Sequence, residues 1–154
     1  TREQYTPALH RRLELIGLPH KREKLFSGDY FIASDIDGME ITLSNTAAVE
    51  RKMSLDELAM CFGTERKRFV REFERAKEIG MRIYMLVENA SYENLYNHKY
   101  RSMLSPNAFT ASLFAWMTRY DCRVIFCKEE TAPKVIHDIL YRELKERLER
   151  GDFG

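Results

Sequence analysis

Residues 49–57 read Val-Glu-Arg-Lys-Met-Ser-Leu-Asp-Glu, and this stretch decides how the rest of the chain is interpreted. Ser54 and Glu57 have the spacing of a capping box, in which a serine caps a helix and an acid three residues later bonds back to it. We therefore expect a strand that ends in Glu50-Arg51-Lys52 and a helix that begins directly after Ser54.

The three charged residues at this strand end are separated by the alternation of a β-strand. Side chains at positions i and i+2 share one face, about 6.5 Å apart, and the residue between them points to the other face. Glu50 and Lys52 are therefore expected on one face and Arg51 on the opposite face. A carboxylate beside an ammonium group suits a metal ion and the charge that develops on a phosphate.

A second acidic motif, Gly28-Asp29-Tyr30, lies in residues 23–32, which also have the pattern of a strand. Gly28 predicts a bulge or a close approach of two backbones beside the acid. Neighbouring strands would place Asp29 next to Glu50. Asp56 would lie in the first turn of the following helix, where the helix dipole favours a carboxylate that supports the site. This set predicts metal-assisted hydrolysis of a phosphodiester.

Gly-Asp-Tyr, followed by Glu-Arg-Lys and then by Asp after three further residues, resembles the motif of XPF-type structure-specific endonucleases. That family is a branch of the restriction-endonuclease-like nucleases. The resemblance runs from Thr1-Arg2-Glu3 to the helix that starts at Thr131. It implies an α/β fold of the restriction-endonuclease type, with a central mixed β-sheet flanked by helices, and it implies DNA as the substrate.

The resemblance also assigns roles by position. The residues implied for the site are Glu3, Asp29, Glu50, Arg51, Lys52 and Asp56. Asp29, Glu50 and the main-chain carbonyl of Arg51 would bind a magnesium or manganese ion, and Lys52 would be the catalytic lysine. Glu3 would be a supporting acid at the end of the first strand. These ligand atoms are hard oxygen donors, which suit magnesium or manganese better than zinc or copper.

We expect a single nuclease domain over residues 1–154, and two departures from the family pattern bear on its ends. The family has an apolar strand ending in aspartate just before the position of Thr1-Arg2-Glu3, so we expect a truncated first strand. The second departure is that we expect no helix-hairpin-helix pair after Gly151, although such nucleases often use one to hold DNA.

Other readings of these motifs stay open. A non-catalytic module for DNA binding or dimerisation on the same fold is one alternative, and a nuclease that acts on RNA or on DNA ends is another. A partner without activity should have lost Asp29, Glu50 or Lys52, and this chain has all three. A second copy, Glu65-Arg66-Lys67, is followed at the matching position by Arg71 and is interpreted as an exposed helix face.

Basic residues gather in one predicted helix although the formal net charge of the chain is only +1. Phe69, Phe73, Ala76 and Ile79 recur at helical spacing on the opposite side, so the basic residues should face outward. Thr64 would cap this helix and Gly80 would end it. The residues predicted to contact DNA phosphates are Arg66, Lys67, Arg68 and Arg71.

Composition is that of a domain with one core, since 44% of the 154 residues are hydrophobic. No apolar stretch approaches the roughly 20 residues that span a bilayer, and no signal peptide is visible, so we expect a cytoplasmic protein without a membrane role. The three cysteines have no zinc-site spacing and are interpreted as reduced thiols.

The remaining elements complete the expected α/β layer. Helices should begin at Thr6-Pro7, Ser105-Pro106 and Pro133, and the apolar runs 81–87 and 124–127 should be strands covered on both faces. The C-terminal helix carries two apolar rows, one with Val135 and the other with Ile136. One row suffices to cover a sheet, so we expect a homodimer through this helix, as the resemblance also implies.

Overall fold

Apolar runs of the sequence form the strands of a central sheet in the computed structural model, which describes residues 1, 3–4, 6–21, 23, 25, 27–36 and 38–151. The helices are α1 Pro7–Ile16, α2 Leu55–Phe62, α3 Arg66–Glu78, α4 Tyr92–Tyr96, α5 Pro106–Tyr120 and α6 Ala132–Glu149. The strands are β1 Ala33–Ile36, β2 Met39–Thr42, β3 Ala47–Lys52, β4 Arg82–Glu88 and β5 Arg123–Cys127.

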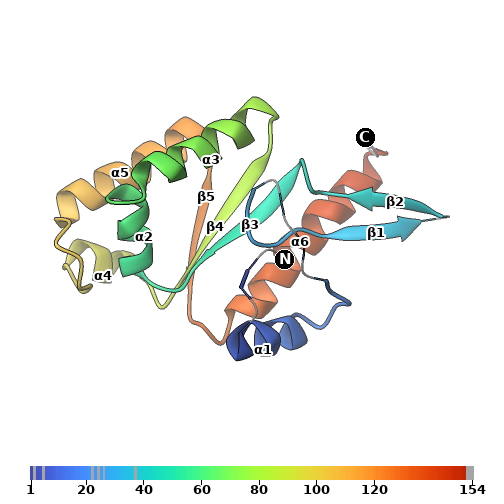
Figure 1. Ribbon diagram of the computed structural model, residues 1–154, viewed down its shortest axis with the longest axis horizontal. Helices are drawn as coiled ribbons and strands as arrows, with labels where there is room; N and C mark the ends of the chain where they lie inside the picture. Colours follow the sequence, from blue (N-terminus) through green and yellow to red (C-terminus); the bar gives the residue numbers. More distant parts are fainter. Residues whose placement is uncertain are drawn as a thin grey trace.

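The sheet combines parallel and antiparallel pairing, as expected for the fold class. Strands β3, β4 and β5 are parallel and lie in that order, with Lys52 paired to Val87. On the free edge of β3, Tyr30 forms an antiparallel bridge with Val49. Strands β1 and β2 form a separate antiparallel hairpin that extends beside α6 (Figure 1).

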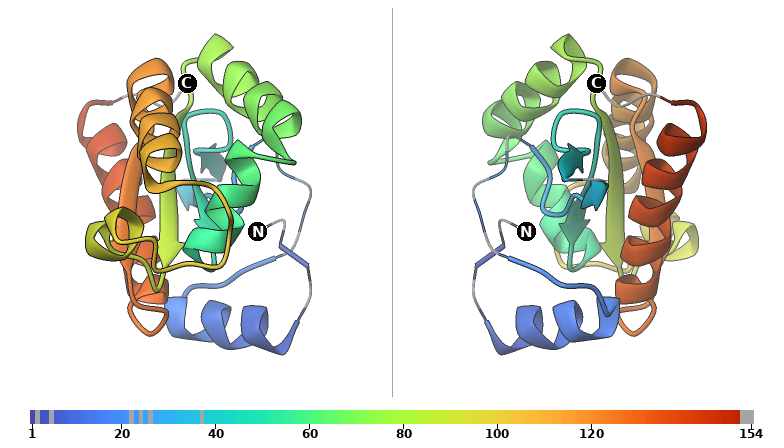
Figure 2. Two further views of the ribbon diagram at one scale, coloured as in Figure 1. Left: turned by 90° about the vertical axis from the view of Figure 1, so that its left-hand side faces the viewer. Right: turned by 90° about the vertical axis from the view of Figure 1, so that its right-hand side faces the viewer.

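Helices cover both faces of the parallel sheet, as Figures 1 and 2 show. One face is covered by α2, α3 and α5, whose apolar side chains pack around Trp116 and contact Met85 and Val87 of β4. The other face is covered by α1 and α6, which pack against Val49 and Leu86. Because successive residues of β4 point to opposite cores, residues 83–87 of the strand are apolar or aromatic.

Helix ends agree with the local sequence signals in most places. Thr6 caps α1 and Ser105 caps α5, each followed by a proline in the first turn. Ser54 caps α2 through the N–H of Glu57, but the Glu57 carboxylate accepts from the N–H of Met53 rather than from Ser54.

The expected strand over residues 23–32 is wrong: among its described residues, only Tyr30 pairs with β3. The N–H groups of Asp29 and Tyr30 both donate to the carbonyl of Val49, at 2.7 and 3.0 Å. Two residues opposite one is the arrangement of a β-bulge, which ends regular pairing.

Two expectations about α3 are also wrong. Thr64 does not cap the helix, because the first helical residue is Arg66 and the capping position is occupied by Glu65. The N–H of Glu65 donates to the carbonyl of Met60. Ile79 lies past the last helical residue and is 45% exposed, so it leaves the apolar face formed by Phe69 and Phe73.

Candidate active site at the end of strand β3

The bulge beside Val49 sets the position of Asp29. Gly28 has φ 78°, a conformation that favours glycine, and a Cβ built on it would lie 2.5 Å from the Cβ of Ala48. Only glycine therefore lets this segment lie against β3. The expected close approach of two backbones is confirmed, and it places Asp29 beside the charged end of the strand.

Asp29 contacts the backbone of the Glu-Arg-Lys motif directly. Its Oδ2 accepts a hydrogen bond from the N–H of Arg51 at 2.8 Å, and its side chain is half-buried. Its charge also acts on Lys52, since the Asp29 carboxylate is one of the groups that favour the protonated form of the lysine. The structure thus brings Asp29 to the same strand end as the motif residues.

Glu50 and Lys52 share one face of β3, as alternation predicts. The Nζ of Lys52 lies 3.0 Å from Oε1 of Glu50, and both side chains are less than 10% exposed. The ammonium group also lies 5.5 Å from the centre of the Phe69 ring. Burial works against the charge on Lys52, but the nearby negative groups, Glu50 foremost and Asp29 among them, together outweigh it, so the pKa of Lys52 is raised. Lys52 is therefore a cation at neutral pH.

Arg51 points to the opposite face and pairs with Glu88 at the end of β4. Its Nε and a terminal nitrogen donate to the two carboxylate oxygens of Glu88 at 2.6 and 2.9 Å, a bidentate geometry that holds both groups in place. The pKa of Arg51 is raised, because Glu88 and Glu3 outweigh the effect of burial.

Behind Arg51, helix α1 adds a second guanidinium group. Arg12 donates to Oε2 of Glu3 at 2.6 Å and to the hydroxyl of Tyr30 at 3.0 Å, and lies 3.9 Å from Glu88. Burial raises the pKa of Tyr30, with a further contribution from Glu3. Glu3 also lies 3.7 Å from a terminal nitrogen of Arg51. It is therefore a neighbour of Arg51, on the face of β3 that does not carry Glu50.

Sequence reasoning missed Arg12, Tyr30 and Glu88 as members of this charge network. A signal was present for two of them. Arg12 interrupts the apolar face of a helix that also carries Leu9, and Glu88 follows directly after the run of apolar and aromatic residues that ends at Val87. Charges in such places are buried only with partners.

Asp56 lies apart from this network. Its Oδ1 accepts from the N–H groups of Arg101 and Ser102, at 2.7 and 2.8 Å, in the segment between α4 and α5. The structure therefore places Asp56 in the first turn of α2, as expected, where its carboxylate holds the segment between α4 and α5.

The oxygen atoms near Asp29 suit a hard divalent cation. Among the described residues, no three or more His, Cys, Asp or Glu side chains gather as a metal-binding group. Magnesium fits the carboxylates of Asp29 and Glu50, because it usually binds one or two carboxylates and keeps several waters. Asp29, Glu50 and the carbonyl of Arg51 are the groups that would hold it.

The basic residues of α3 are exposed, as predicted, on the side opposite Phe69 and Phe73. Arg68 pairs with Glu65, and Arg66 lies 5.6 Å from the centre of the Trp116 ring. Lys67 and Arg71 form no ion pair with any residue that the structure describes. Part of this helix face is therefore available to phosphate groups.

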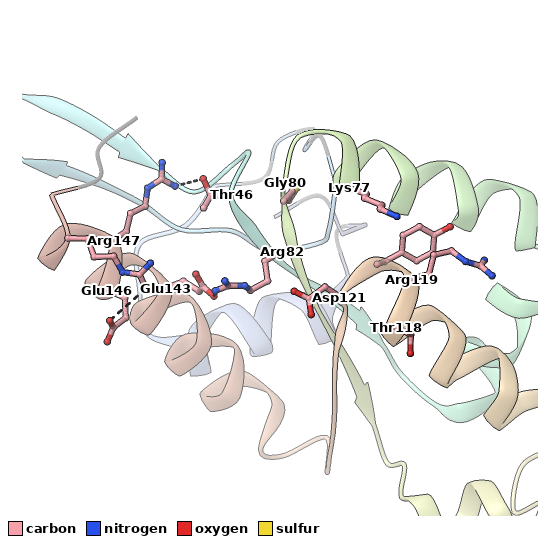
Figure 3. Close-up of a pocket in the computed structure, with 13 residues that line it drawn as sticks. Thr46, Lys77, Gly80, Arg82, Thr118, Arg119, Asp121, Glu143, Glu146 and Arg147 are labelled. Atoms are coloured by element: carbon pink, nitrogen blue, oxygen red, sulfur yellow. Dashed lines mark hydrogen bonds and ion pairs between the residues drawn. The ribbon is translucent and has the colours of Figure 1, made fainter.

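Two cavities lie away from Asp29, Glu50 and Lys52. One, of about 340 Å³, lies between the start of β4 and the ends of α3, α5 and α6 (Figure 3). The other, of about 580 Å³, lies between the α1–β1 connection and α6. Among the helices in the described ranges, none has the length and apolar character needed to cross a membrane.

The three cysteines are free thiols, as expected. Cys61 and Cys122 are buried, and Cys127 is half-buried. Burial raises the pKa of Cys122 to about 12, so this thiol is protonated at neutral pH.

Comparison with known proteins agrees with this fold. XPF from Aeropyrum pernix has a similar fold, with a TM-score of 0.63 and 21% sequence identity, over 92% of this chain and 58% of that chain. This chain thus spans little more than half the length of the XPF chain it matches. No curated protein matches its sequence. The sequence profile of the ERCC4 domain matches residues 1–134, which include every residue of the site, and the chain therefore belongs to this family of XPF-type nuclease domains.

Proposed function

We propose that this chain is a DNA endonuclease that hydrolyses phosphodiester bonds with a divalent cation, magnesium or manganese. One observation carries the proposal: the bulge at Val49 brings Asp29 to the strand end at which Glu50 and Lys52 share a face. Two carboxylates and a cation at one point are the groups that metal-assisted phosphodiester hydrolysis needs.

Each residue would have a distinct part in the reaction. A bound cation would supply a nucleophilic water and neutralise phosphate charge. Asp29 and Glu50 would hold it, with the main-chain carbonyl of Arg51. Lys52 is a cation at neutral pH and so would orient water or stabilise the negative charge of the phosphate rather than act as a base. Arg51 would keep its own backbone in place through Glu88.

Substrate binding would use the basic face of α3. Arg66, Lys67, Arg68 and Arg71 would contact phosphates, which gives affinity without sequence preference. The Phe69 side chain, on the buried face of the same helix, lies 5.5 Å from the Lys52 ammonium group, so α3 packs directly against the strand that carries the site. We propose branched or flapped DNA as the substrate, in line with the family.

We also propose that the chain forms a homodimer through α6. Val135 and Ile139 are half-buried against the core around β3, whereas Tyr141 on the same helix is 49% exposed. The apolar surface left for a partner is therefore smaller than two full rows. A homodimer here would be isologous, with the same helix face from both copies.

The experiment is a cleavage assay on flaps, forks, nicked duplex and single strands, with EDTA or with added magnesium or manganese. We expect cutting of at least one branched DNA only when a cation is present. An RNA substrate of the same shape is the comparison that separates the DNA-specific proposal from its alternative. A non-catalytic module would bind these DNAs and cut none of them.

A further inference from the structure

The segment from Asn97 to Leu104, between α4 and α5, is a closely bonded loop. The Nε2 of His98 lies 2.8 Å from the carbonyl oxygen of Ser102, and the hydroxyl of Tyr100 donates to the carbonyl of Leu104 at 2.6 Å. The Tyr100 ring also stacks on His98, with ring centres 4.3 Å apart. These contacts define one conformation of the loop backbone.

Asp56 fixes this loop to the start of α2, four residues after Lys52. Its Oδ1 accepts from two successive backbone N–H groups, those of Arg101 and Ser102, at 2.7 and 2.8 Å. On the other side, Tyr100 packs edge-on against Phe109 of α5. The loop thus lies beside the helix that directly follows the active-site strand (Figures 1 and 2).

Exposure alternates along the loop. Tyr100, Ser102 and Leu104 are half-buried against the protein, whereas Lys99, Arg101 and Met103 are exposed. These three exposed side chains, Lys99, Arg101 and Met103, are called the outward face of the loop.

The outward face combines cationic and apolar groups. Neither Lys99 nor Arg101 forms an ion pair with a residue that the structure describes. Met103 is 92% exposed, the highest exposure among the large hydrophobic side chains described. Cations bind phosphates, and apolar side chains contact or enter base steps that are already unstacked.

We propose that this loop is a DNA-contacting element in which Lys99 and Arg101 bind phosphates and Met103 contacts unstacked bases next to the cleavage site. The inference rests on the proposed function and adds to it a reason for preferring branched DNA over continuous duplex. Asp56 is then a positioning residue for the loop. A loop that is already ordered loses little conformational entropy when DNA binds.

The first experiment measures binding in EDTA, so that it does not depend on catalysis. The variant Lys99→Gln/Arg101→Gln is compared with Arg119→Gln/Lys128→Gln, which removes the same charges from the end of α5 and from the segment after β5 (Arg119 is drawn in Figure 3). Affinity for forked DNA is measured by fluorescence anisotropy over a range of salt concentrations. The loop variant should reduce the slope of log affinity against log salt by about 2, and the control should leave it unchanged.

A second experiment tests Met103. Met103→Ser should lower the ratio of affinities for forked over matched linear duplex by roughly fivefold, without a change in the salt slope. Met60→Ser on α2 is the matched control, since Met60 is also an exposed methionine, at 54%. Equal ratios for the wild-type chain and the Met103 variant contradict the role of this side chain.

Asp56 separates the loop role from a catalytic one. Asp56→Asn keeps a side-chain oxygen for the N–H groups of Arg101 and Ser102, so forked-DNA binding should be retained, whereas Asp56→Ala should lose as much as the loop variant. Circular dichroism establishes that each variant is folded. If the wild-type chain cuts DNA but every loop variant binds like wild type, the inference is wrong and the proposed nuclease stands. If the loop variants lose DNA binding and the wild-type chain cuts no DNA with any added cation, the inference stands and the catalytic proposal fails.

Discussion

Gly28 and Gly38 have almost the same φ, 78° and 79°, but different surroundings. A Cβ at Gly28 would lie 2.5 Å from that of Ala48, whereas one at Gly38 would have no heavy atom within 4 Å. Gly38→Ala should therefore cost only the backbone strain of a left-handed alanine, about 1 kcal/mol. Gly28→Ala should cost about 2 kcal/mol more and should also abolish cleavage, because Asp29 must move.

Urea denaturation of both glycine variants gives the two free energies of unfolding, and their difference isolates the steric contact. Similar losses for Gly28→Ala and Gly38→Ala would show that the segment at Gly28 can shift away from Ala48 without cost.

Asp29 offers the cleanest test of the site. Asp29→Asn removes the charge but keeps an oxygen to accept the N–H of Arg51, so cleavage should fall at least about 100-fold while folding and DNA binding persist. Glu50→Gln should act in the same way. Lys52→Ala should also abolish cleavage. The measurement is single-turnover cleavage beside binding in EDTA, and wild-type rates in all three variants would refute the assignment.

Glu88 should contribute to the stability of the fold rather than to the cleavage reaction. Glu88→Ala should destabilise the fold by about 3–5 kcal/mol, because it leaves the buried Arg51 and Arg12 short of a counter-charge. Glu65→Ala is the control, since its ion pair with Arg68 is exposed and should be worth less than about 1 kcal/mol. Denaturant unfolding distinguishes the two, and equal losses would contradict a structural role for Glu88.

Residue spacing predicts which side chains of one strand share a face, but it carries little information about the neighbouring strand. Glu50 and Lys52 were predictable as a pair for this reason. Glu88 was not, because its contact with Arg51 depends on the register of β3 against β4. The hydrogen bonds of Asp56 depend in the same way on a loop more than forty residues further along the chain.

At the scale of elements, α3 should supply much of the affinity for DNA. Replacing Arg66, Lys67, Arg68 and Arg71 by Gln should weaken binding of every DNA sequence and lower the salt slope by up to about 4. The matched control replaces four exposed basic residues outside α3 and α6, namely Arg11, Lys21, Arg119 and Lys128. Anisotropy measured at several salt concentrations decides the matter, and equal slopes for the two variants would remove α3 from the interface.

Elements with strong periodic signals were predictable, and those that depend on tertiary pairing were not. Strands β4 and β5 and helices α1, α5 and α6 follow from apolar runs and capping residues. Residues 23–32 have strand-like composition, but the bulge at Asp29 and Tyr30 stops regular pairing. Gly28 marked the bulge and the close approach in advance, but local propensity does not report that regular pairing stops there, since this depends on how the segment lies against β3.

For the whole molecule, the metal requirement is the broadest prediction. Protein treated with EDTA should be inactive, and magnesium or manganese should restore cleavage, because the oxygen donors at Asp29 and Glu50 suit hard cations. Calcium should support DNA binding but little cutting. Full activity in EDTA would exclude the metal mechanism.

Assembly is the second prediction at this scale. Light scattering at micromolar concentration should give the mass of a dimer, and Tyr141→Glu on the outer side of α6 should shift it toward the monomer of 18.2 kDa. Glu149→Lys, another single charge change on the same helix, is the control. A strict monomer for the wild-type chain would contradict the dimer.

Alternation along β3 places the residues proposed for cleavage and the residue that holds the strand in place on opposite faces. Glu50 and Lys52 lie on one face, and Arg51 fastens the strand to β4 on the other. A chain with Asp29→Asn should consequently stay folded and still bind a branched DNA that it can no longer cleave. Expressed beside the active form, such a copy would be a competitive inhibitor made from the nuclease itself.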